Sequence, residues 1–347
     1  MIKRRKSRVV YIRDIGVGGD NEIRVESMTK VPAKNEKEII NQINELEKAG
    51  CEIVRIALPD LESCEKIPVI KKNTNIPIVG DIHFDYKIAL KAIDNGIDSI
   101  RINPGNIRDK EKVKLIVKLL KERKISVRIG VNSGSIDRKK FPFLNADSMV
   151  ESAMEHIKIL EEEGFYDIIV SLKSTDILTT IESYEKFAKI RDYPLHIGIT
   201  EAGTKFSGSI KSAIGLGILL YKGLGDTIRV SLSSSPVDEV MVAYKILKFL
   251  NLRENIIEVI SCPTCARAEF DVMKIAEEVE KNFFNLRKNI KIAIMGCVVN
   301  GPGEAKDADI GFAGSGKKVA LFVNGKVLKI IEPENIIKEI ENYIKNL

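Results

Sequence analysis

The sequence predicts an α/β protein in which a (β/α)8 TIM barrel is followed by a small α+β domain. Short apolar, β-branched runs alternate with amphipathic helical segments along most of the chain, and this rhythm changes after about Leu250. Alternation at this spacing predicts parallel strands joined by right-handed crossovers. Eight such units in about 230 residues match the size of a closed barrel.

Eight apolar runs are the candidate barrel strands. They begin near Glu22, Glu52, Pro77, Asp98, Ser126, Asp167, Pro194 and Asp226. Helix-period segments between them include Glu36–Ala49, Asp109–Arg123, Ala146–Glu163, Asp176–Ile190, Ser209–Lys222 and Pro236–Leu250. An open doubly wound sheet is the alternative, but no glycine fingerprint of a switch point accompanies these runs.

The remaining residues predict a second domain, so the predicted boundaries are 1–252 and 253–347. Its candidate strands are Ile256–Ile260, Lys291–Met295, Asp309–Phe312, Lys318–Val323 and Lys326–Ile330, and its helices are Arg267–Leu286 and Glu334–Ile344. Asn324-Gly325 between two apolar runs is a strong signal of a type I′ hairpin.

Composition is that of an ordinary cytoplasmic globular protein, with 44% hydrophobic and 30% charged residues. We expect no membrane partner, because no apolar run is long enough to span a bilayer and the basic start lacks a signal-peptide core. Five scattered cysteines argue for a reducing cytosol rather than a disulfide framework. A net charge of +6 suits an anionic ligand or an acidic redox partner.

Three cysteines in the second domain are the strongest chemical signal. Cys262 and Cys265 form a C-x-x-C pair, and Cys297 supplies a third thiol in a Gly/Pro-rich segment. No histidine follows His196, which excludes a Cys3His zinc site here. Three thiolates favour an iron–sulfur cluster with one iron left to a weaker ligand, for which Glu304 is the candidate. A redox dithiol or a zinc knuckle is the alternative for the C-x-x-C pair alone.

Cations lie at the C-terminal ends of the predicted barrel strands, where such barrels place their active sites. They are Arg55, Arg101, Arg128, Lys173 and Arg229. Polar residues at equivalent places are Asp81, His83, Asn103, Asn132, Ser171 and Glu201. Strand alternation directs these side chains into the barrel mouth, because the apolar faces pack against the helices.

The charges at the mouth do not balance. Five cations against the carboxylates Asp81 and Glu201 leave an excess of three, which predicts a phosphate-type anion site. Ser231–Pro236 and Gly203–Ser209 precede the last two barrel helices, where TIM barrels commonly bind phosphate. An internal salt-bridge network open to water is the alternative.

Other candidate residues are interpreted more simply. His83 lies beside Asp81 and is as much a site candidate as a structural residue, whereas His196 in mid-strand is interpreted as a core histidine. His156 is interpreted as a surface residue of a helix. We expect Cys51 and Cys64 to act as small buried hydrophobes.

Five segments together resemble one protein family. They are Ser261–Cys265 (SCPTC), Met295–Ala305 (MGCVVNGPGEA), Ile199–Gly203 (ITEAG), Lys211–Gly217 (KSAIGLG) and Gly225–Ser231 (GDTIRVS). They closely resemble the IspG/GcpE family of 4-hydroxy-3-methylbut-2-en-1-yl diphosphate synthases, in its shorter bacterial two-domain form. The resemblance runs from about Arg8 to the C-terminus.

The resemblance implies an oxidoreductase of the non-mevalonate (MEP) pathway of isoprenoid biosynthesis. It would convert 2-C-methyl-D-erythritol 2,4-cyclodiphosphate to (E)-4-hydroxy-3-methylbut-2-enyl diphosphate by two-electron reductive ring opening and dehydroxylation at a unique cluster iron. It also implies a 4Fe–4S cluster held by Cys262, Cys265, Cys297 and Glu304, with flavodoxin or ferredoxin as electron donor. In the implied homodimer, the barrel mouth of one subunit faces the cluster domain of the other.

The resemblance also implies a role for each candidate residue and for each predicted domain. Residues 1–252 would bind substrate and residues 253–347 would hold the cluster. Glu201 would protonate the departing oxygen, and Glu304 would be both catalytic and a metal ligand. The expected substrate-binding residues are Arg55, Asp81, His83, Arg101, Asn103, Arg128, Asn132, Ser171, Lys173, Arg229 and Ser231. Glu26 stands where the family usually has Gln, and we expect its side chain to point away from the mouth.

Two other classes of function are weaker hypotheses. A zinc-stabilised transferase on a phosphate-binding barrel predicts a colourless protein and gives Glu304 no role. A nucleic-acid-binding module would use the net charge and the basic segment Lys3–Arg8. It predicts salt-sensitive binding to any duplex, and we expect no nucleic-acid partner.

Overall fold

The computed structural model describes residues 2–104, 106–107, 109–297, 303 and 305–347. It divides into two compact units, Met1–Leu252 and Arg253–Leu347. Among the described residues, no helix is both long and apolar enough to cross a membrane.

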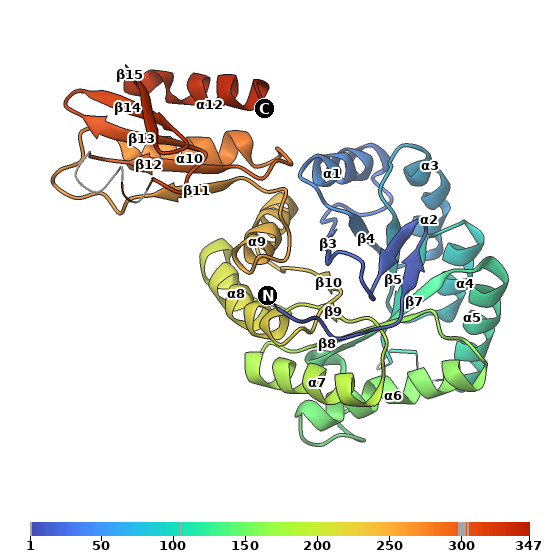
Figure 1. Cartoon of the computed structure of the whole chain (residues 1–347). Coiled ribbons are helices and arrows are strands. Elements are labelled where there is room, and N and C mark those ends of the chain that lie inside the picture. The colour runs from blue at the N-terminus through green and yellow to red at the C-terminus, as the bar shows by residue number, and fades with distance from the viewer. Residues whose placement is uncertain (1, 105, 108, 298–302, 304) are drawn as a thin grey trace. The chain divides into compact units, whose positions relative to one another are not determined.

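The described part of the first unit contains an eight-stranded parallel sheet (Figure 1). Its strands are β3 (Arg24–Met28), β4 (Ile53–Leu58), β5 (Ile78–Ile82), β6 (Ser99–Ile102), β7 (Ser126–Asn132), β8 (Ile168–Lys173), β9 (His196–Ile197) and β10 (Thr227–Ile228). The order is β8-β7-β6-β5-β4-β3-β10-β9, and a bridge between Val170 and Leu195 brings β8 to β9. The predicted (β/α)8 barrel is confirmed, and the open-sheet alternative is wrong.

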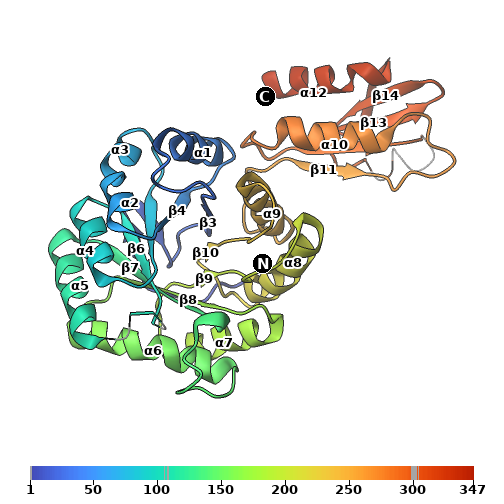
Figure 2. The same ribbon diagram turned by 180° about the vertical axis from the view of Figure 1, so that it is seen from behind.

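Helices surround the barrel, as seen from the opposite side in Figure 2. They are α1 (Glu36–Lys48), α2 (Leu61–Glu65), α3 (Ile67–Lys72), α4 (Tyr86–Asp94), α5 (Lys110–Arg123), α6 (Ala146–Glu162), α7 (Ile177–Ile190), α8 (Lys205–Tyr221) and α9 (Pro236–Phe249), with a 3₁₀ turn η1 (Ser133–Ser135) after β7. On α1, for example, Ile39, Ile43 and Leu46 are fully buried at helical spacing, which gives this helix an apolar inner face.

Helix α8 begins four residues before the predicted start at Ser209. The sequence analysis placed Gly203–Ser209 before this helix. In the structure, a Cβ at Gly208 would lie 2.6 Å from Leu232 Cδ2 and 2.9 Å from the Gly203 carbonyl oxygen. Gly208 therefore lets the first turn of α8 pack closely against Leu232 and Gly203, and it does not end the helix.

An N-terminal hairpin that the sequence did not predict packs at the start of the barrel strands. It consists of β1 (Val10–Ile12) and β2 (Ile15–Val17). Its apolar residues form a cluster with Ile53, Val79 and Ile169, from β4, β5 and β8. These three residues therefore face the barrel interior, and alternation places the residues two positions later on the same side.

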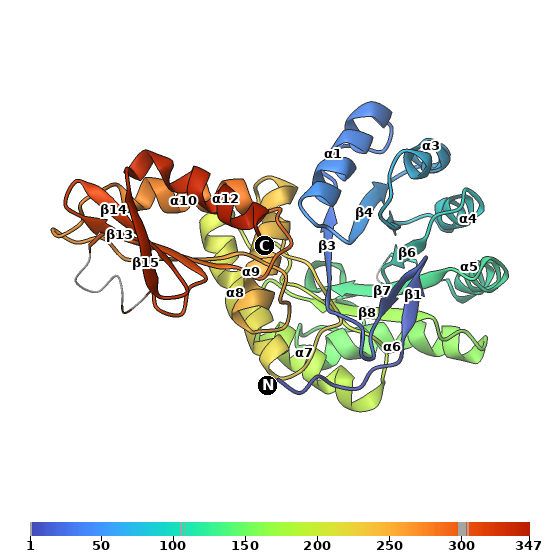
Figure 3. The same ribbon diagram turned by 45° about the horizontal axis from the view of Figure 1, so that its top comes forward.

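The second unit is a sheet covered by helices. In its described part, the strands β11 (Glu258–Ser261), β12 (Lys291–Met295), β13 (Ile310–Ser315), β14 (Lys318–Val323) and β15 (Lys326–Ile331) lie in that order. Helices α10 (Val272–Phe283) and α12 (Ile336–Lys345), the latter preceded by the 3₁₀ turn η2 (Pro333–Asn335), lie on one face (Figure 3). Val279, Phe312 and Ile340 are fully buried in the core between them.

Two local predictions in this unit had different outcomes. Asn324 and Gly325 have φ angles of 50° and 74°, as a type I′ turn requires, so the predicted hairpin of β14 and β15 is confirmed. Helix α10 begins five residues after the predicted Arg267, because the Asp271 side chain accepts a hydrogen bond from the Lys274 amide and caps the helix there.

Candidate functional site

A layer of charged side chains fills the barrel interior above the apolar cluster. Arg55 and Asp81 follow the inward-facing Ile53 and Val79 by two residues, and Asp81 is paired in register with Arg101. Arg101 Nη1 donates to Asp81 Oδ1 at 3.1 Å, and its Nη2 donates to the Gly130 carbonyl oxygen at 2.9 Å. A Cβ at position 130 would lie 2.5 Å from Arg101 Nε, so glycine makes room for the guanidinium group.

These neighbours change the pKa values of the buried groups. Burial alone would raise the pKa of Asp81, but Arg55 and Arg101 outweigh it and lower that pKa to about 2. Burial lowers the pKa of Arg55 to about 9, although Asp81 at 3.9 Å opposes the shift. The carboxylate of Asp81 is thus ionised and held between two cations near neutral pH.

Glu26 corrects one expectation from the sequence, because its side chain points into the barrel rather than away from it. It is 1% exposed, and its Oε2 accepts a hydrogen bond from Arg128 Nη1 at 2.6 Å. Burial would raise the pKa of Glu26, but the charge of Arg128 outweighs this effect and lowers it. Glu26 is therefore a carboxylate of the same layer as the arginines.

Lys173 and His196 form the next contact in this layer. Lys173 Nζ lies 2.8 Å from His196 Nε2, and His196 Nδ1 lies 2.7 Å from Thr227 Oγ1. His196 is fully buried with both ring nitrogens hydrogen-bonded, which confirms its interpretation as a core histidine. Burial and the surrounding cations hold the pKa of both Lys173 and His196 well below the usual values.

Glu239, on α9, is a buried carboxylate that the sequence analysis missed. It accepts hydrogen bonds from Ser27 Oγ at 3.0 Å and from the Leu232 amide at 3.1 Å. Its Oε2 also lies 3.7 Å from Arg229 Nη2. An acidic residue in the first turn of a helix is usually explained by the helix dipole, so no local signal revealed its contact with the barrel.

The charge balance therefore differs from the sequence-based count but keeps its sign. The carboxylates that meet the five cations are Asp81, Glu26 and Glu239, and within the described residues Glu201 makes no ion pair with them. The cations still exceed the carboxylates by two. Arg101 Nε, Arg128 Nε and Nη2, and Arg229 Nε are buried N–H donors without a described partner.

The remaining predicted residues lie at the ends of the strands. Asn132 and Glu201 line one pocket of about 480 Å³, together with Ser133, Ser135 and Thr200. Glu201 is exposed and has a φ of 50°, an uncommon backbone conformation for a non-glycine residue that often marks functional sites.

Further predicted residues surround this mouth. Asn103 Nδ2 donates to Ser135 Oγ at 2.7 Å, which links the ends of β6 and β7. His83 Nε2 lies 3.9 Å from Asp81 Oδ2. Ser171 is buried on β8 and lies close to Gly130, where an added Cβ would be 3.0 Å from the Ser171 Oγ. Ser231 follows β10 and is half-buried. The barrel thus brings together most of the predicted substrate-binding residues.

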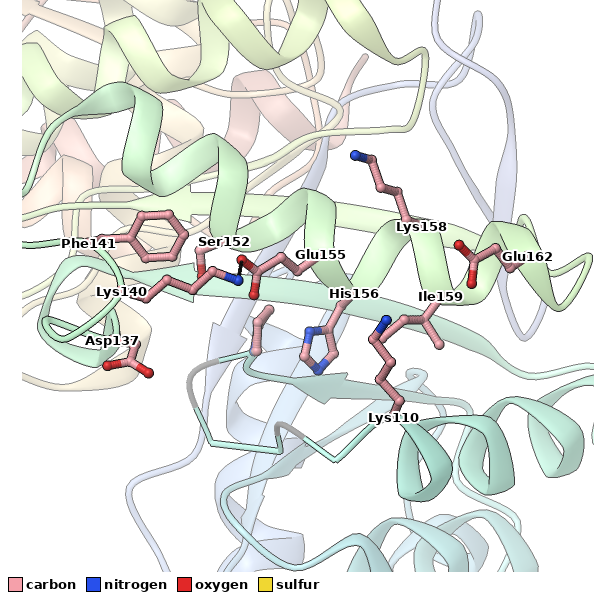
Figure 4. A pocket seen from close by; sticks show the side chains of 11 residues that line it. Lys110, Asp137, Lys140, Phe141, Ser152, Glu155, His156, Lys158, Ile159 and Glu162 are labelled. Carbon is pink, nitrogen blue, oxygen red and sulfur yellow. Dashed lines mark ion pairs between the residues drawn. The ribbon is translucent and has the colours of Figure 1, made fainter.

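His156 corrects another expectation, because it is buried rather than on the surface. It is 3% exposed on α6, and its Nε2 lies 2.6 Å from the Ile107 carbonyl oxygen. Figure 4 shows it in a pocket of about 440 Å³ whose wall also holds Lys110 and the ion pair of Lys140 with Glu155. None of the predicted site residues that the structure describes is among those lining this pocket.

The three predicted cysteine ligands line one pocket of the second unit. Cys262 and Cys297 follow β11 and β12, which are parallel neighbours, and Cys265 lies in the turn after Cys262. The pocket encloses about 360 Å³ and is also lined by Arg267 and Met295. The Gly296 amide donates to Cys262 Sγ at 3.2 Å, a contact that favours a thiolate. No disulfide joins the five cysteines in the part of the chain that the structure describes, and Cys51 and Cys64 are buried as predicted.

The predicted fourth ligand, Glu304, lies outside the described residues. Among those that are described, no group of three His, Cys, Asp or Glu side chains is arranged to hold a metal ion. A zinc ion with Zn–S bonds of about 2.3 Å needs closely gathered thiolates. The donor set nevertheless fits a larger sulfur-ligated group, since three thiols border a pocket of about 360 Å³.

The fold and the two sites define a class: a TIM-barrel protein with an interior cation layer and a separate thiol-bearing α+β unit. Residues 7–244 match the GcpE TIM-barrel domain, and residues 258–346 match the GcpE protein C-terminal domain. The chain therefore belongs to the GcpE family.

Relatives are similar over nearly their whole length. A 4-hydroxy-3-methylbut-2-en-1-yl diphosphate synthase (flavodoxin) of Geobacillus kaustophilus is 53% identical over 350 residues, covering 100% of this chain and 94% of the relative. The protein of the same name from Caldanaerobacter subterraneus subsp. tengcongensis is 50% identical, with 99% of each chain covered.

Solved structures support the barrel assignment. Dihydropteroate synthase from Stenotrophomonas maltophilia has a TM-score of 0.51 at 14% identity, covering 66% of this chain and 92% of its own. The enzyme from Vibrio fischeri has a TM-score of 0.51 at 15% identity and covers 71% of this chain and 99% of its own. At this identity, the similarity concerns the fold alone.

Proposed function

We propose that this chain is a 4-hydroxy-3-methylbut-2-en-1-yl diphosphate synthase, an oxidoreductase of the MEP pathway of isoprenoid biosynthesis. It opens and dehydroxylates 2-C-methyl-D-erythritol 2,4-cyclodiphosphate with two electrons. The observation that carries the proposal is the combination, in one chain of this family, of a barrel interior rich in cations and a pocket bordered by three thiols.

The barrel interior binds the diphosphate in this proposal. Arginine N–H donors match phosphate oxygens in a planar fork, and the buried donors of Arg101, Arg128 and Arg229 have no described partner. An anion compensates the excess positive charge at low dielectric, so binding offsets the desolvation of these cations. The remaining phosphate contacts come from Arg55, Lys173 and Ser231. The polar wall of the site is formed by Asp81, His83, Asn103, Asn132 and Ser171.

Glu201 is the proposed proton donor. It lies in the 480 Å³ pocket beside Asn132 and Thr200, and its left-handed backbone conformation fixes where the carboxyl group is presented. A hydroxyl group is a poor leaving group unless it is protonated. A carboxylic acid that donates a proton to it allows it to depart as water. The exposed position of Glu201 lets it regain its proton from solvent.

The second unit holds a 4Fe–4S cluster in this proposal, with Cys262, Cys265 and Cys297 as thiolate ligands and Glu304 as the fourth, catalytically exchangeable ligand. The donor chemistry and the size of the thiol-bordered pocket support a cluster over a single zinc ion. When bound, the cluster supplies the two electrons one at a time and acts as a Lewis acid. The Gly296 amide stabilises negative charge on the Cys262 sulfur.

Flavodoxin or ferredoxin is the proposed electron donor, and the names of the relatives specify flavodoxin. We also place the protein in the cytoplasm, because three thiols kept as metal ligands require a reducing compartment.

A homodimer is the proposed assembly. An exposed apolar stripe runs along α8, formed by Phe206, Ile210, Ile214, Ile218 and Tyr221. Contiguous exposed apolar surface on a globular protein commonly marks an interface. Ile214→Glu should therefore halve the mass measured by light scattering, whereas an unchanged mass would remove α8 from the interface.

The test is turnover under anaerobic conditions. Purified protein with reduced flavodoxin should convert the cyclic diphosphate to 4-hydroxy-3-methylbut-2-enyl diphosphate, detected by mass spectrometry. Cys265→Ala should lose this activity. The matched control Cys51→Ala, which removes a buried thiol in the barrel unit, should retain it. Absence of product from iron-loaded parent protein would overturn the proposal.

A further inference from the structure

His196 is a buried residue whose contacts exceed what core packing requires. It lies on β9 in register with Thr227 of β10, fully buried in the barrel interior. Each ring nitrogen has one close polar neighbour: Thr227 Oγ1 at 2.7 Å from Nδ1, and Lys173 Nζ at 2.8 Å from Nε2. Glu26 Oε2 lies 3.7 Å from Nδ1.

These contacts fix the roles of the two nitrogens. An anion bound beside Lys173 favours its ammonium form, which has three N–H donors and no lone pair and so can only donate to His196. Nε2 is then the unprotonated acceptor, and Nδ1–H donates to Thr227 Oγ1 on the side where the Glu26 carboxylate lies. Burial and the charges of Arg128, Lys173 and Arg55 keep the pKa of His196 low, so the imidazole accepts without adding another positive charge.

Lys173 needs such a partner because its other neighbours are mostly cations. Burial and the charges of Arg55, Arg229 and Arg128 all disfavour its ammonium form, and Glu26 is the carboxylate that opposes them. Gly198 provides the space, since a Cβ there would lie 2.8 Å from Lys173 Nζ. With one N–H bond to His196, two donors of Lys173 have no partner among the described residues and can meet an anion.

We infer that His196 is a positioning residue: as a neutral acceptor oriented by Thr227, it holds the Lys173 ammonium group in place for the diphosphate of the substrate. This inference rests on the proposed function for the identity of the substrate, but only on the interior geometry for the anion. His196 itself touches no substrate and acts through Lys173.

The test compares two amides at position 196 in the iron-loaded, full-length protein. The Gln amide reaches the position of Nε2 and can accept from Lys173, whereas the shorter Asn amide reaches only the position of Nδ1 beside Thr227. Binding of inorganic pyrophosphate is measured by calorimetry, with thermal melting as a check of folding. We expect His196→Gln to bind within about threefold of the parent and His196→Asn to bind roughly tenfold to a hundredfold more weakly.

A double-mutant cycle separates positioning from packing. Lys173→Met alone should weaken pyrophosphate binding, and adding His196→Asn to it should cause no further loss, because His196 acts only through Lys173. Equal binding by His196→Asn and the parent, equal loss in both amide variants, or additive losses in the cycle would each overturn the inference.

The cycle also distinguishes this inference from the proposed function. A parent protein that binds pyrophosphate and shows the expected pattern at position 196, but never converts the cyclic diphosphate, supports the positioning role and removes the proposed reaction. If the parent turns over substrate while His196→Asn binds pyrophosphate normally, the proposed reaction is supported and the positioning role is removed. Failure of the parent to bind pyrophosphate overturns the positioning role, because there is then no anion for Lys173 to meet.

Discussion

The barrel interior and the cysteine pocket differ in how their functional side chains are held. In the barrel, buried charged and polar groups hold one another in place: Arg101 bonds Asp81, Arg128 bonds Glu26, and Lys173 bonds His196. In the second unit, the thiols lie just beyond strand ends and Cys265 is exposed. Cys262 has an amide donor, but no described carboxylate or histidine completes a ligand group with these thiols.

The difference concerns what each site needs in order to form. The barrel layer is built from groups that must pair on folding, since an unpaired buried charge costs several kcal/mol, so it is coupled to the stability of the barrel. Among the described residues, no group of three His, Cys, Asp or Glu side chains is arranged to hold a metal ion, so metal binding would gather these thiols as ligands. Changes in the barrel layer should therefore affect stability and anion binding together, whereas changes in the thiols should affect the cluster and activity alone.

The largest expected effect is the loss of the cluster in Cys297→Ser. Turnover should fall to background and the visible absorption of the iron-loaded protein should disappear, because a thiolate ligand is lost. The thermal transition of the barrel unit should stay unchanged. Cys64→Ala, which removes a buried thiol of the barrel unit, is the matched control and should keep the colour. An unchanged spectrum in Cys297→Ser would remove Cys297 from the ligand set.

Glu201→Gln should separate chemistry from binding. Loss of the proton donor is expected to lower kcat by roughly 10²- to 10⁴-fold. The iron content and the affinity for the cyclic diphosphate should remain, since Glu201 makes no ion pair with the described barrel cations. Near-normal turnover, measured with reduced flavodoxin, would exclude Glu201 as the acid.

Arg128→Met should show how strongly the barrel layer is coupled to stability. The side chains of Arg128 and Glu26 are 3% and 0% exposed, so removing one leaves an uncompensated buried charge. We expect a loss of about 3–5 kcal/mol in the free energy of unfolding by urea, most of it recovered when Glu26→Leu is added. A loss below about 1 kcal/mol would show that Glu26 and Arg128 are solvated independently.

Acid should weaken the barrel in a defined pH window. The pKa of Asp81 is about 2 in the folded state against an ordinary value of 3.8, so its stabilisation is present above pH 3.8 and is lost as the pH falls toward 2. The pKa of Glu26 is also lowered and contributes with the same sign. Melting temperatures from pH 6 to pH 2 should fall less steeply in Asp81→Asn; equal slopes would contradict this assignment.

Much of the fold and of the candidate site was predictable, because strand alternation and spacing are local properties. Ser99–Asn103 and Thr227–Ser231 carry polar residues on one face, and Arg101 and Arg229 do face the charged layer. Alternation could not orient Glu26, because β3 also carries Ser27 on its other face. The partner of Ser27 is Glu239, 212 residues away in the sequence, and no local pattern reveals that contact.

His156 was misjudged for a different reason, since a signal was present. Met149, Ala153 and Leu160 lie seven and three residues before it and four residues after it and are buried, so the periodicity of α6 placed His156 on the inner face. The N-terminal hairpin was missed because its strands have only three residues each, and so short a run carries no periodicity.

The central claim is that one chain carries both a reducing cluster, held in the cysteine pocket, and an anion-binding barrel. Its most direct test is the iron, acid-labile sulfide and zinc content of protein purified without oxygen, together with the visible absorption spectrum. We predict a brown protein with about four irons and four sulfides per chain. A colourless protein with one zinc ion per chain would contradict the claim and favour a zinc-stabilised transferase on the same barrel.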